Sequence, residues 1–564
     1  MDSSGVFPNV RALSPTAKQI LNKRYMWEGE KTWDELVDRV MNYIIPTDDK
    51  DFELIKEMIM HRYFMPNSPV LVNAGKPDAG LAACYVVDFK DTIEDIYKTK
   101  YDFALVARKG GGCGTTLSNL RPKGSNVKGS THGYAGGPVA FADTISRDMA
   151  VISQGGLRSM AIMFTISCYH PDIIEFILAK ENEDDKKIEN ANMSVVVDNN
   201  FMELVKADKT YWTEFNNVKY KEYKARDIFN LIIEGAWRNG EPGLLFQDRI
   251  NDSPYKYTGQ KIQACNPCGE EPLPPGGVCN LASLDLSKFV SKQEKVTDYE
   301  KLELACRLGT RFLDKVIDRS SYPTEEISKW VKNNRPIGLG IFGFADYCLM
   351  KQIAYGSDES IKELDLILSK IYSWAKDESE KLGKEIGVPK ECKKLPEPRR
   401  NITLVTVAPT GTVSLIGGAS SGIEPVFSEI VVRNDKTGTY IFEEKLADKP
   451  YFRCAVSANG ATEVTWEEHV KVLATAQKNV DSGVAKTINF PNHTHRDTFY
   501  KAVFMAWEMG CKGIAMYRNG SRKLEVLTPK NIKKDLCLNC NTPLVNINNI
   551  KTCPSCGWKL KLES

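Results

Sequence analysis

The feature that most constrains this chain is a proline-rich stretch that places an amide, a thiol and a carboxylate within five residues. Asn266-Pro-Cys-Gly-Glu270 is followed by Glu-Pro-Leu-Pro-Pro-Gly-Gly-Val and by a second cysteine, Cys279. Proline lacks a backbone donor and disfavours helical geometry, so the stretch is predicted to be a stiff, extended loop. Such a loop can hold Cys268 away from regular structure and carry its sulfur into a cavity. Two nearby cysteines can also be inert and buried, and the motif alone leaves that alternative open.

Size and composition are compatible with a soluble intracellular protein. The 564-residue chain is 42% hydrophobic, which suits one large catalytic domain with appendages. A net charge of +2 argues against a dedicated nucleic-acid or membrane-surface protein. No secretory leader opens the sequence and no apolar run reaches about 18 residues, so we expect a cytoplasmic protein. Fifteen cysteines, an odd number spread over a long chain, are expected to be mostly reduced.

The loop and seven further blocks resemble the ribonucleotide reductases. In that family the loop reads Asn-Pro-Cys-Gly-Glu and is followed, at the same distance, by a cysteine and Asn-Leu, here Cys279-Asn-Leu281. The other blocks, in family order, are NSPVLVNAG (67–75), LAACYVV (81–87), QGGLRS (154–159), RPIGLGIFGFAD (335–346), APTGTVS (408–414), SGIEP (421–425) and GCKGIAMYRNGSR (510–522). Together they cover most of residues 60–522.

The resemblance implies an α/β fold, a ten-stranded α/β barrel of two five-stranded halves with the Cys268 loop threading its centre. Short apolar runs such as 192–198 and 402–408 alternate with helical stretches, as an α/β architecture requires. The expected domains are a helical N-terminal segment without an ATP-binding cone (1–60), the barrel (61–522), a polar linker (523–536) and a zinc-ribbon-like tail (537–564). Without the cone, overall on/off control by ATP and dATP is expected to be missing.

By the same resemblance, five residues carry the chemistry. Cys268 would bear a thiyl radical, which suits abstraction of a ribose hydrogen because S–H and activated C–H bonds are similar in strength. Glu270 would be the general base for a substrate hydroxyl, and Asn266 a neutral amide that holds the hydroxyls. Cys84 and Cys279 would supply two electrons and close as a disulfide. These two cysteines lie far apart in the sequence, so the pairing rests on the resemblance, and Cys84 alone could be a buried strand residue.

Substrate contacts are implied for Ser68, Ala83, Pro409, Thr410, Gly411 and Thr412. The last four would form a phosphate loop between the strand-like segment 402–408 and a helix whose N-terminus faces the phosphate. A plain turn is the alternative. The segment 338–343 also matches GxGxxG, but no buried strand precedes it, so we predict no dinucleotide site there.

A deoxynucleotide effector that sets substrate choice is implied for Asp91, Thr92, Arg121 and Arg158. Asp91, Thr92 and Glu94 predict a capping box, from Asp91 to Glu94, at the start of a helix, and capping alone would account for these residues. In the family, the arginine matching Arg121 faces the effector phosphates and the one matching Arg158 reads the base. Family effector sites lie at a subunit interface, so a homodimer is expected.

The radical source separates the classes within the family. Enzymes that need a metal-containing partner subunit carry adjacent tyrosines where Ala515-Met-Tyr-Arg518 has one. The block is most similar to the adenosylcobalamin-dependent, class II ribonucleoside-diphosphate reductases, although the DxHxxG cobalamin motif is missing. The class I large subunit is the alternative, and glycyl-radical enzymes are less similar. An inactive nucleotide-binding regulator would not need Cys268 and its partner residues. The near-neutral charge and most of the length of the chain argue against a zinc-ribbon interaction protein.

The tail predicts a zinc site from two CxxC pairs, Cys537, Cys540, Cys553 and Cys556. Four thiolates suit a closed tetrahedral zinc site that helps fold a module with almost no core. A redox-active tail is the alternative. Class II relatives commonly carry a further cysteine for re-reduction of the active-site disulfide, and this chain ends without one. Either the tail cysteines serve as shuttles, or an external thioredoxin- or glutaredoxin-like dithiol does. A nucleic-acid role of the tail is not favoured.

Overall fold

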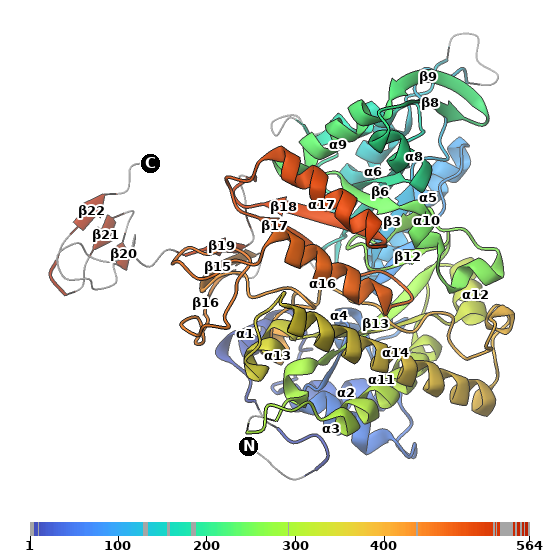
Figure 1. Ribbon diagram of the computed structural model, residues 1–564. Helices are drawn as coiled ribbons and strands as arrows, with labels where there is room; N and C mark the ends of the chain where they lie inside the picture. The colour runs from blue at the N-terminus through green and yellow to red at the C-terminus, as the bar shows by residue number, and fades with distance from the viewer. Residues whose placement is uncertain are drawn as a thin grey trace.

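The chain forms a barrel with helices around it and a helical N-terminal region beside it (Figure 1). The computed structural model describes residues 5–9, 11–127, 133–154, 158–181, 188–291, 293–435, 438–522, 525, 527–530, 545–547, 550–552, 555–557 and 559–561. No helix within these ranges is long and apolar enough to cross a membrane.

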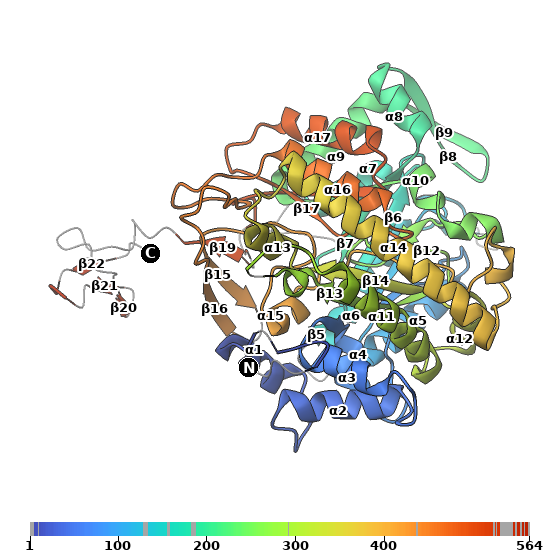
Figure 2. The same cartoon turned by 60° about the horizontal axis from the view of Figure 1, so that its bottom comes forward.

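The N-terminal helices are α1 (Pro15–Arg24), α2 (Trp33–Ile44) and α3 (Phe52–Met60), followed by α4 (Ser68–Asn73). Helix α2 begins with a capping box, in which Thr32 and Glu35 each bind the other's backbone N–H. Its apolar side is buried, with Leu36, Val37 and Val40 inaccessible to solvent. Figure 2 shows these helices grouped on one side of the molecule, next to α11 (Tyr299–Arg319). The predicted helical N-terminal segment is confirmed.

The first half of the barrel is a parallel sheet of five strands. In sheet order they are β2 (Cys84–Val86), β3 (Gly112–Thr116), β6 (Ile162–Ser167), β7 (Asn192–Val197) and β10 (Gly243–Phe246). The helices of this half are α5 (Ile93–Lys109), α6 (Pro138–Val151), α7 (Ile173–Ile177), α8 (Asn199–Lys206), α9 (Ala225–Asn239) and α10 (Gln247–Asn251). A hairpin of β8 (Thr210–Phe215) and β9 (Val218–Lys224) adjoins α8 and α9.

The second half is also parallel. Its assigned strands are β13 (Val278–Asp285), β14 (Ile337–Phe342), β17 (Thr487–Phe490) and β18 (Gly513–Arg518). The predicted strand 402–408 is reduced to two parallel bridges, Leu339 with Val405 and Val407 with Val484, but it lies between β14 and the approach to β17. This segment therefore closes the barrel as its fifth element.

The two halves meet through antiparallel pairs, β10 with β18 and β13 with β2, and β1 (Phe64–Pro66) adds to β13 from outside. Ten strand positions in two parallel halves confirm the predicted barrel. The glycines of segment 338–343 lie within and directly after β14, so they form a barrel strand rather than a nucleotide-binding loop.

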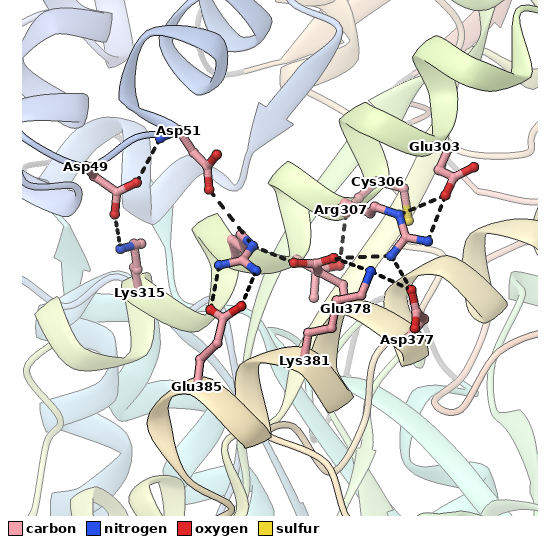
Figure 3. Close-up of polar contacts among 12 residues, drawn as sticks. Asp49, Asp51, Glu303, Cys306, Arg307, Lys315, Asp377, Glu378, Lys381 and Glu385 are labelled. Atoms are coloured by element: carbon pink, nitrogen blue, oxygen red, sulfur yellow. Dashed lines mark hydrogen bonds and ion pairs between the residues drawn. The ribbon is translucent and has the colours of Figure 1, made fainter.

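Helices α11 and α14 (Asp358–Ile386) pack side by side and are joined by a network of ion pairs (Figure 3). Arg311 contacts Glu378 at 2.5 Å and Glu385 at 3.0 Å, and Arg307 contacts Glu378 at 3.2 Å. Lys315 extends the network to the N-terminal region, because its Nζ lies 2.6 Å from Asp49. The network ties the helical region to the barrel.

The other helices of the second half are α12 (Glu325–Asn334), α13 (Phe344–Lys351), α15 (Val413–Gly417), α16 (Trp466–Lys478) and α17 (Arg496–Glu508). A smaller sheet holds β15 (Ile430–Asp435), β16 (Gly438–Glu443) and β19 (Leu527–Pro529).

In the tail, β20 (Val545–Ile547), β21 (Ile550–Thr552) and β22 (Lys559–Lys561) form an antiparallel sheet. Cys537, Cys540 and Cys553 lie outside the described residues, and Cys556 is exposed. Among the described residues no group of three or more side chains is arranged to hold a metal ion. The zinc site therefore stays a prediction.

Candidate active site

The loop that carries Cys268 is a finger inside the barrel, held by both halves. It is closed by the short pair β11 (Ala264–Cys265) and β12 (Pro272–Leu273). From the first half, Asn192 Nδ2 donates to the carbonyl of Pro267 at 2.8 Å. From the second half, Thr406 Oγ1 donates to the carbonyl of Glu270 at 2.9 Å. These bonds fix the backbone on either side of the cysteine.

The barrel wall has no room for a side chain where the finger passes β3. A Cβ on Gly114 would lie 1.8 Å from the carbonyl oxygen of Cys265, so only glycine permits this approach. Gly483 approaches the finger from the opposite side, where its backbone N–H donates a hydrogen bond to the backbone carbonyl of Glu270 at 2.6 Å. The finger is therefore clamped between β3 and the segment before β17.

Asn266 shapes the tip of the finger. Its Oδ1 accepts hydrogen bonds from the N–H groups of Gly269 at 3.1 Å and Glu271 at 2.9 Å. Its Nδ2 donates to Cys84 Sγ at 3.1 Å. The predicted amide thus reaches one of the predicted redox thiols, and its side chain is almost fully buried.

Cys84 and Cys279 lie directly opposite each other in the antiparallel pair of β2 with β13. Opposed residues of such a pair have Cα atoms about 4.5–5.5 Å apart, which lies within the range of about 4.4–6.8 Å that a disulfide needs. Both are buried reduced thiols. Burial raises the pKa of both, and Glu270 raises that of Cys84 while Glu271 raises that of Cys279. Both thiols are therefore protonated at neutral pH.

Cys268 is exposed at the finger tip and lines a cavity of about 860 Å³. The cavity runs between β10, β17, β18 and the loop 419–428. Its lining combines apolar side chains such as Leu244 and Met516 with polar ones such as Gln477 and Asn489. The volume and the mixed lining fit a large organic cofactor. None of the described lining residues is a histidine, so a corrinoid held here would take no imidazole ligand from this lining.

Two consecutive carboxyl groups follow Cys268, and both are buried. Glu270 Oε1 accepts a hydrogen bond from Cys84 Sγ at 3.7 Å. Burial raises the pKa of Glu270, because the charged form is poorly solvated. Burial and the neighbouring Glu270 raise the pKa of Glu271 to about 8. Glu271 was not predicted from the sequence, although a second glutamate directly after the motif was visible there.

The predicted substrate residues are placed as follows. Ala83 and Ala408 belong to the same apolar cluster as Cys84 and Cys279, so the loop of Pro409, Thr410, Gly411 and Thr412 starts from the cluster that holds the predicted redox thiols. Thr410 has a φ of 50°, and its Oγ1 accepts a hydrogen bond from Gly422 N–H at 2.8 Å. The helix that follows, α15, has only five residues, so the predicted helix dipole is weak. Ser68 Oγ lies 2.7 Å from the hydroxyl of Tyr25, which identifies a neighbour that the sequence did not indicate.

Of the four predicted effector residues, Asp91 and Arg121 are in contact with each other. Arg121 Nε donates to Asp91 at 2.8 Å, next to the start of α5. The helix cap differs from the prediction, because Thr92 is the N-cap and its Oγ1 accepts from Asp95 N–H at 3.1 Å. The box predicted from Asp91 to Glu94 is shifted by one residue. Arg158 lies in β5 (Arg158–Ser159), paired with β4 (Ser153–Gln154), and its side chain lies outside the described part of the structure.

A ten-stranded barrel with a central cysteine finger, two opposed thiols and a buried carboxyl defines the class of protein. Residues 82–396 and 396–517 match the family described as ribonucleotide reductase, barrel domain, and residues 11–79 match ribonucleotide reductase, all-alpha domain. The chain belongs to the ribonucleotide reductase family.

Named relatives indicate which members of the family this chain resembles. The vitamin B12-dependent ribonucleoside-diphosphate reductase of Thermoplasma acidophilum is 38% identical over 92% of this chain and 72% of its own length. The enzyme of the same name from Mycobacterium tuberculosis is 32% identical, over 92% of this chain and 81% of its own. Among solved structures, the Actinobacillus ureae class Id ribonucleotide reductase alpha subunit matches with a TM-score of 0.74 at 21% identity, over 91% of this chain and 98% of that chain. This last likeness concerns the fold alone.

Proposed function

We propose that the protein reduces ribonucleoside diphosphates to 2'-deoxyribonucleotides, with adenosylcobalamin as the radical source and a dithiol as the reductant. The observation that carries the proposal is the meeting of five residues from two distant segments, Cys84 in one and Asn266, Cys268, Glu270 and Cys279 in the other. The names of the similar enzymes support both the substrate class and the cofactor. The class I alternative would require a separate radical-generating subunit.

The residues divide the reaction among them. Adenosylcobalamin, when bound, would supply the radical chemistry that takes the hydrogen atom from the thiol of Cys268. The Cys268 sulfur then abstracts a ribose hydrogen, and Glu270 accepts the proton of the neighbouring hydroxyl. Cys84 and Cys279 provide two electrons and two protons, of which one proton leaves with the hydroxyl as water and the other goes to the same ribose carbon, and the pair closes as a disulfide. Glu270 then gives its proton back to the neighbouring oxygen, and Cys268 returns the hydrogen atom to the ribose.

The cavity beside Cys268 is the proposed cofactor site. Apolar residues of β10 and β18, such as Leu244 and Met516, would pack against the ring, and Gln477, Lys486 and Asn489 would bind its polar groups. Cys268 is exposed and lines this cavity, so a cofactor bound there would lie beside its thiol.

The test is an anaerobic assay of the purified protein with a ribonucleoside diphosphate, dithiothreitol and either adenosylcobalamin or no cofactor. Product that appears only with adenosylcobalamin supports the proposal, and Cys268→Ser should abolish turnover. Activity that appears only with a metal-loaded second subunit would assign the protein to the partner-dependent class.

We further propose a homodimer that forms across α5 and binds a deoxynucleotide effector near Asp91 and Arg121. Ile93, Tyr97 and Tyr101 form an apolar stripe along α5 and are 54%, 60% and 62% exposed. An exposed stripe of this kind favours a partner helix. Tyr97→Glu should shift the protein from dimer to monomer in sedimentation velocity, whereas a monomeric wild type would contradict the dimer.

The tail is proposed to bind one zinc ion through Cys537, Cys540, Cys553 and Cys556. Elemental analysis of the purified chain should find about one zinc per chain, as expected for a four-thiolate site. Cys553→Ser should remove most of it. A chain without zinc whose tail cysteines cycle with turnover would favour the redox-active alternative.

A further inference from the structure

The side chain of Glu271 is a second buried carboxyl group that the proposed reaction does not use. It is inaccessible to solvent, and its backbone is fixed by the bond from its N–H to Asn266. On β14, a Cβ at Gly338 would lie 2.9 Å from Glu271 Oε1, so the absence of a side chain there makes room for the carboxyl. The fold therefore builds a specific place for this group.

The surroundings of Glu271 include the thiol of Cys279. The side chains of Cys279, Ser482 and Thr406 face the carboxyl, yet within the described chain neither of its oxygens makes a hydrogen bond of good geometry. The titratable and charged groups that act on it are Cys84, Tyr255, Glu270, Cys279 and Lys512. Leu281 Cδ2 and Glu271 Oε1 lie 2.5 Å and 2.9 Å from the same Cβ position at Gly338, and Leu281 is two residues from Cys279 on the same face of β13. The acceptors near a proton on Glu271 are therefore the thiol of Cys279 and the hydroxyl groups of Ser482 and Thr406.

Lys512 does not neutralise Glu271 by a direct ion pair. Its buried Nζ donates to the backbone carbonyls of Asp481 and Ser482, the latter at 2.8 Å. An unpaired buried carboxyl is more stable in its neutral form. Since the pKa of Glu271 is raised to about 8, the group holds its proton at neutral pH.

The two redox thiols are thus each matched with one of two consecutive carboxyl groups. Glu270 contacts Cys84, and Glu271 faces Cys279. We propose that Glu271 is the proton donor to Cys279 when an external dithiol reopens the Cys84–Cys279 disulfide. This inference rests on the proposed function, because it requires that the two cysteines form the redox pair.

The step balances as follows. A thiolate of the external dithiol attacks Cys84 Sγ, a mixed disulfide forms, and the Cys84–Cys279 bond breaks. Cys279 leaves with the bonding electron pair and takes the proton of Glu271. The second thiol of the reductant then attacks the mixed disulfide and releases Cys84. The reductant ends as a disulfide, and its two protons restore Cys84 and Glu271.

Burial explains why a donor is needed. A thiolate released at Cys279 would be surrounded by apolar and acidic groups, which disfavour its charge. A positioned acid typically contributes about 100-fold or more to such a step. The expected effect of losing it is therefore about a 100-fold slower reopening of the disulfide.

The experiment measures that step directly. The full-length protein is oxidised with diamide, and the loss of the Cys84–Cys279 disulfide during reduction by dithiothreitol is followed by thiol alkylation and peptide mass spectrometry. The wild type is compared with Glu271→Gln, with Glu271→Asp, which keeps a carboxyl, and with the matched control Glu385→Gln on the outer surface of α14. Reduction about 100-fold slower in Glu271→Gln, partial recovery in Glu271→Asp and a wild-type rate in Glu385→Gln are expected.

The pH profile of the wild type provides a readout that needs no variant. Glu271 donates only while protonated, so the rate divided by the thiolate fraction of dithiothreitol should be constant below about pH 8 and fall above it. In Glu271→Gln the fall should disappear. A Glu271→Gln rate within twofold of the wild type, or a wild-type profile without the fall, would overturn the assignment.

A separate measurement isolates the proposed function. Wild-type protein given substrate and adenosylcobalamin without dithiol should form about one deoxynucleotide per active site together with the Cys84–Cys279 disulfide. Failure there would overturn the reductase proposal, whereas the chemically oxidised protein tests Glu271 by itself.

Discussion

Buried carboxyl groups in two regions of this molecule have opposite electrostatic surroundings. Between α11 and α14, Glu378 is 4% exposed and lies against both Arg307 and Arg311. At the finger, Glu270 and Glu271 are equally buried but have no cation in hydrogen-bond contact among the described residues. Hydrogen bonding to Glu385 raises the pKa of Arg311, whereas burial raises the pKa of both finger glutamates.

The difference shows how the same side chain can serve stability or chemistry. A paired carboxylate is held in its charged form and cannot readily take up or release a proton, so it fixes the packing of helices. An unpaired buried carboxyl group has a raised pKa and can exchange protons with a neighbour. Here the unpaired carboxyl group of Glu270 lies beside the thiol of Cys84, whereas the paired Glu378 lies between α11 and α14.

The strongest way to test this contrast is Glu270→Gln. The amide is similar in shape but cannot accept the hydroxyl proton, so kcat should fall by about 100- to 10,000-fold. The thermal unfolding temperature should stay equal or rise, because a buried carboxyl is replaced by a neutral group. Steady-state kinetics and a melting curve measure the two effects, and an unchanged kcat would remove Glu270 from the role of base.

Glu378→Gln tests the buried carboxylate that is paired with arginines. It removes one buried partner of Arg307 and Arg311, and loss of such a partner costs about 2–4 kcal/mol of unfolding free energy when water can partly solvate the arginines. Urea denaturation should detect this loss, while kcat of the folded protein stays within twofold. Glu385→Gln is the control, because its side chain is 49% exposed and its loss should cost less than about 1 kcal/mol. A larger effect on kcat than on stability would contradict a structural role.

Gly338→Ala sharpens the contrast by crowding the unpaired carboxyl. The added methyl group would lie 2.5 Å from both Leu281 Cδ2 and Thr406 Cγ2, besides its contact with Glu271. Overpacking of this kind costs about 1–3 kcal/mol. The melting temperature should fall, and reopening of the disulfide should slow because the carboxyl is displaced from Cys279. If the disulfide reopens at the wild-type rate, the position of Glu271 does not matter for proton transfer.

Prediction from the sequence was most successful where the information is local. The finger could be recognised because Asn266, Cys268 and Glu270 are close in the chain and prolines restrict the segment around them. The cap of α5 was placed one residue early, because Asp91 and Thr92 are both good capping residues and the sequence does not say which one adopts the extended backbone. Segment 402–408 was predicted to be a strand from its apolar pattern. It does lie at a strand position of the barrel, but it makes only two isolated bridges and no regular ladder of backbone hydrogen bonds.

The cysteine finger, the helical N-terminal region and the alternation of strands and helices could be predicted from the amino-acid sequence, because these features depend on neighbouring residues and on periodicity. The fold alone brings Cys84 opposite Cys279, since no local pattern relates residues so far apart. It also decided that Glu271 is buried beside a thiol while Glu378 is buried beside arginines. The proton affinity of a carboxyl group depends on solvation and on nearby charge, and both are properties of the folded molecule.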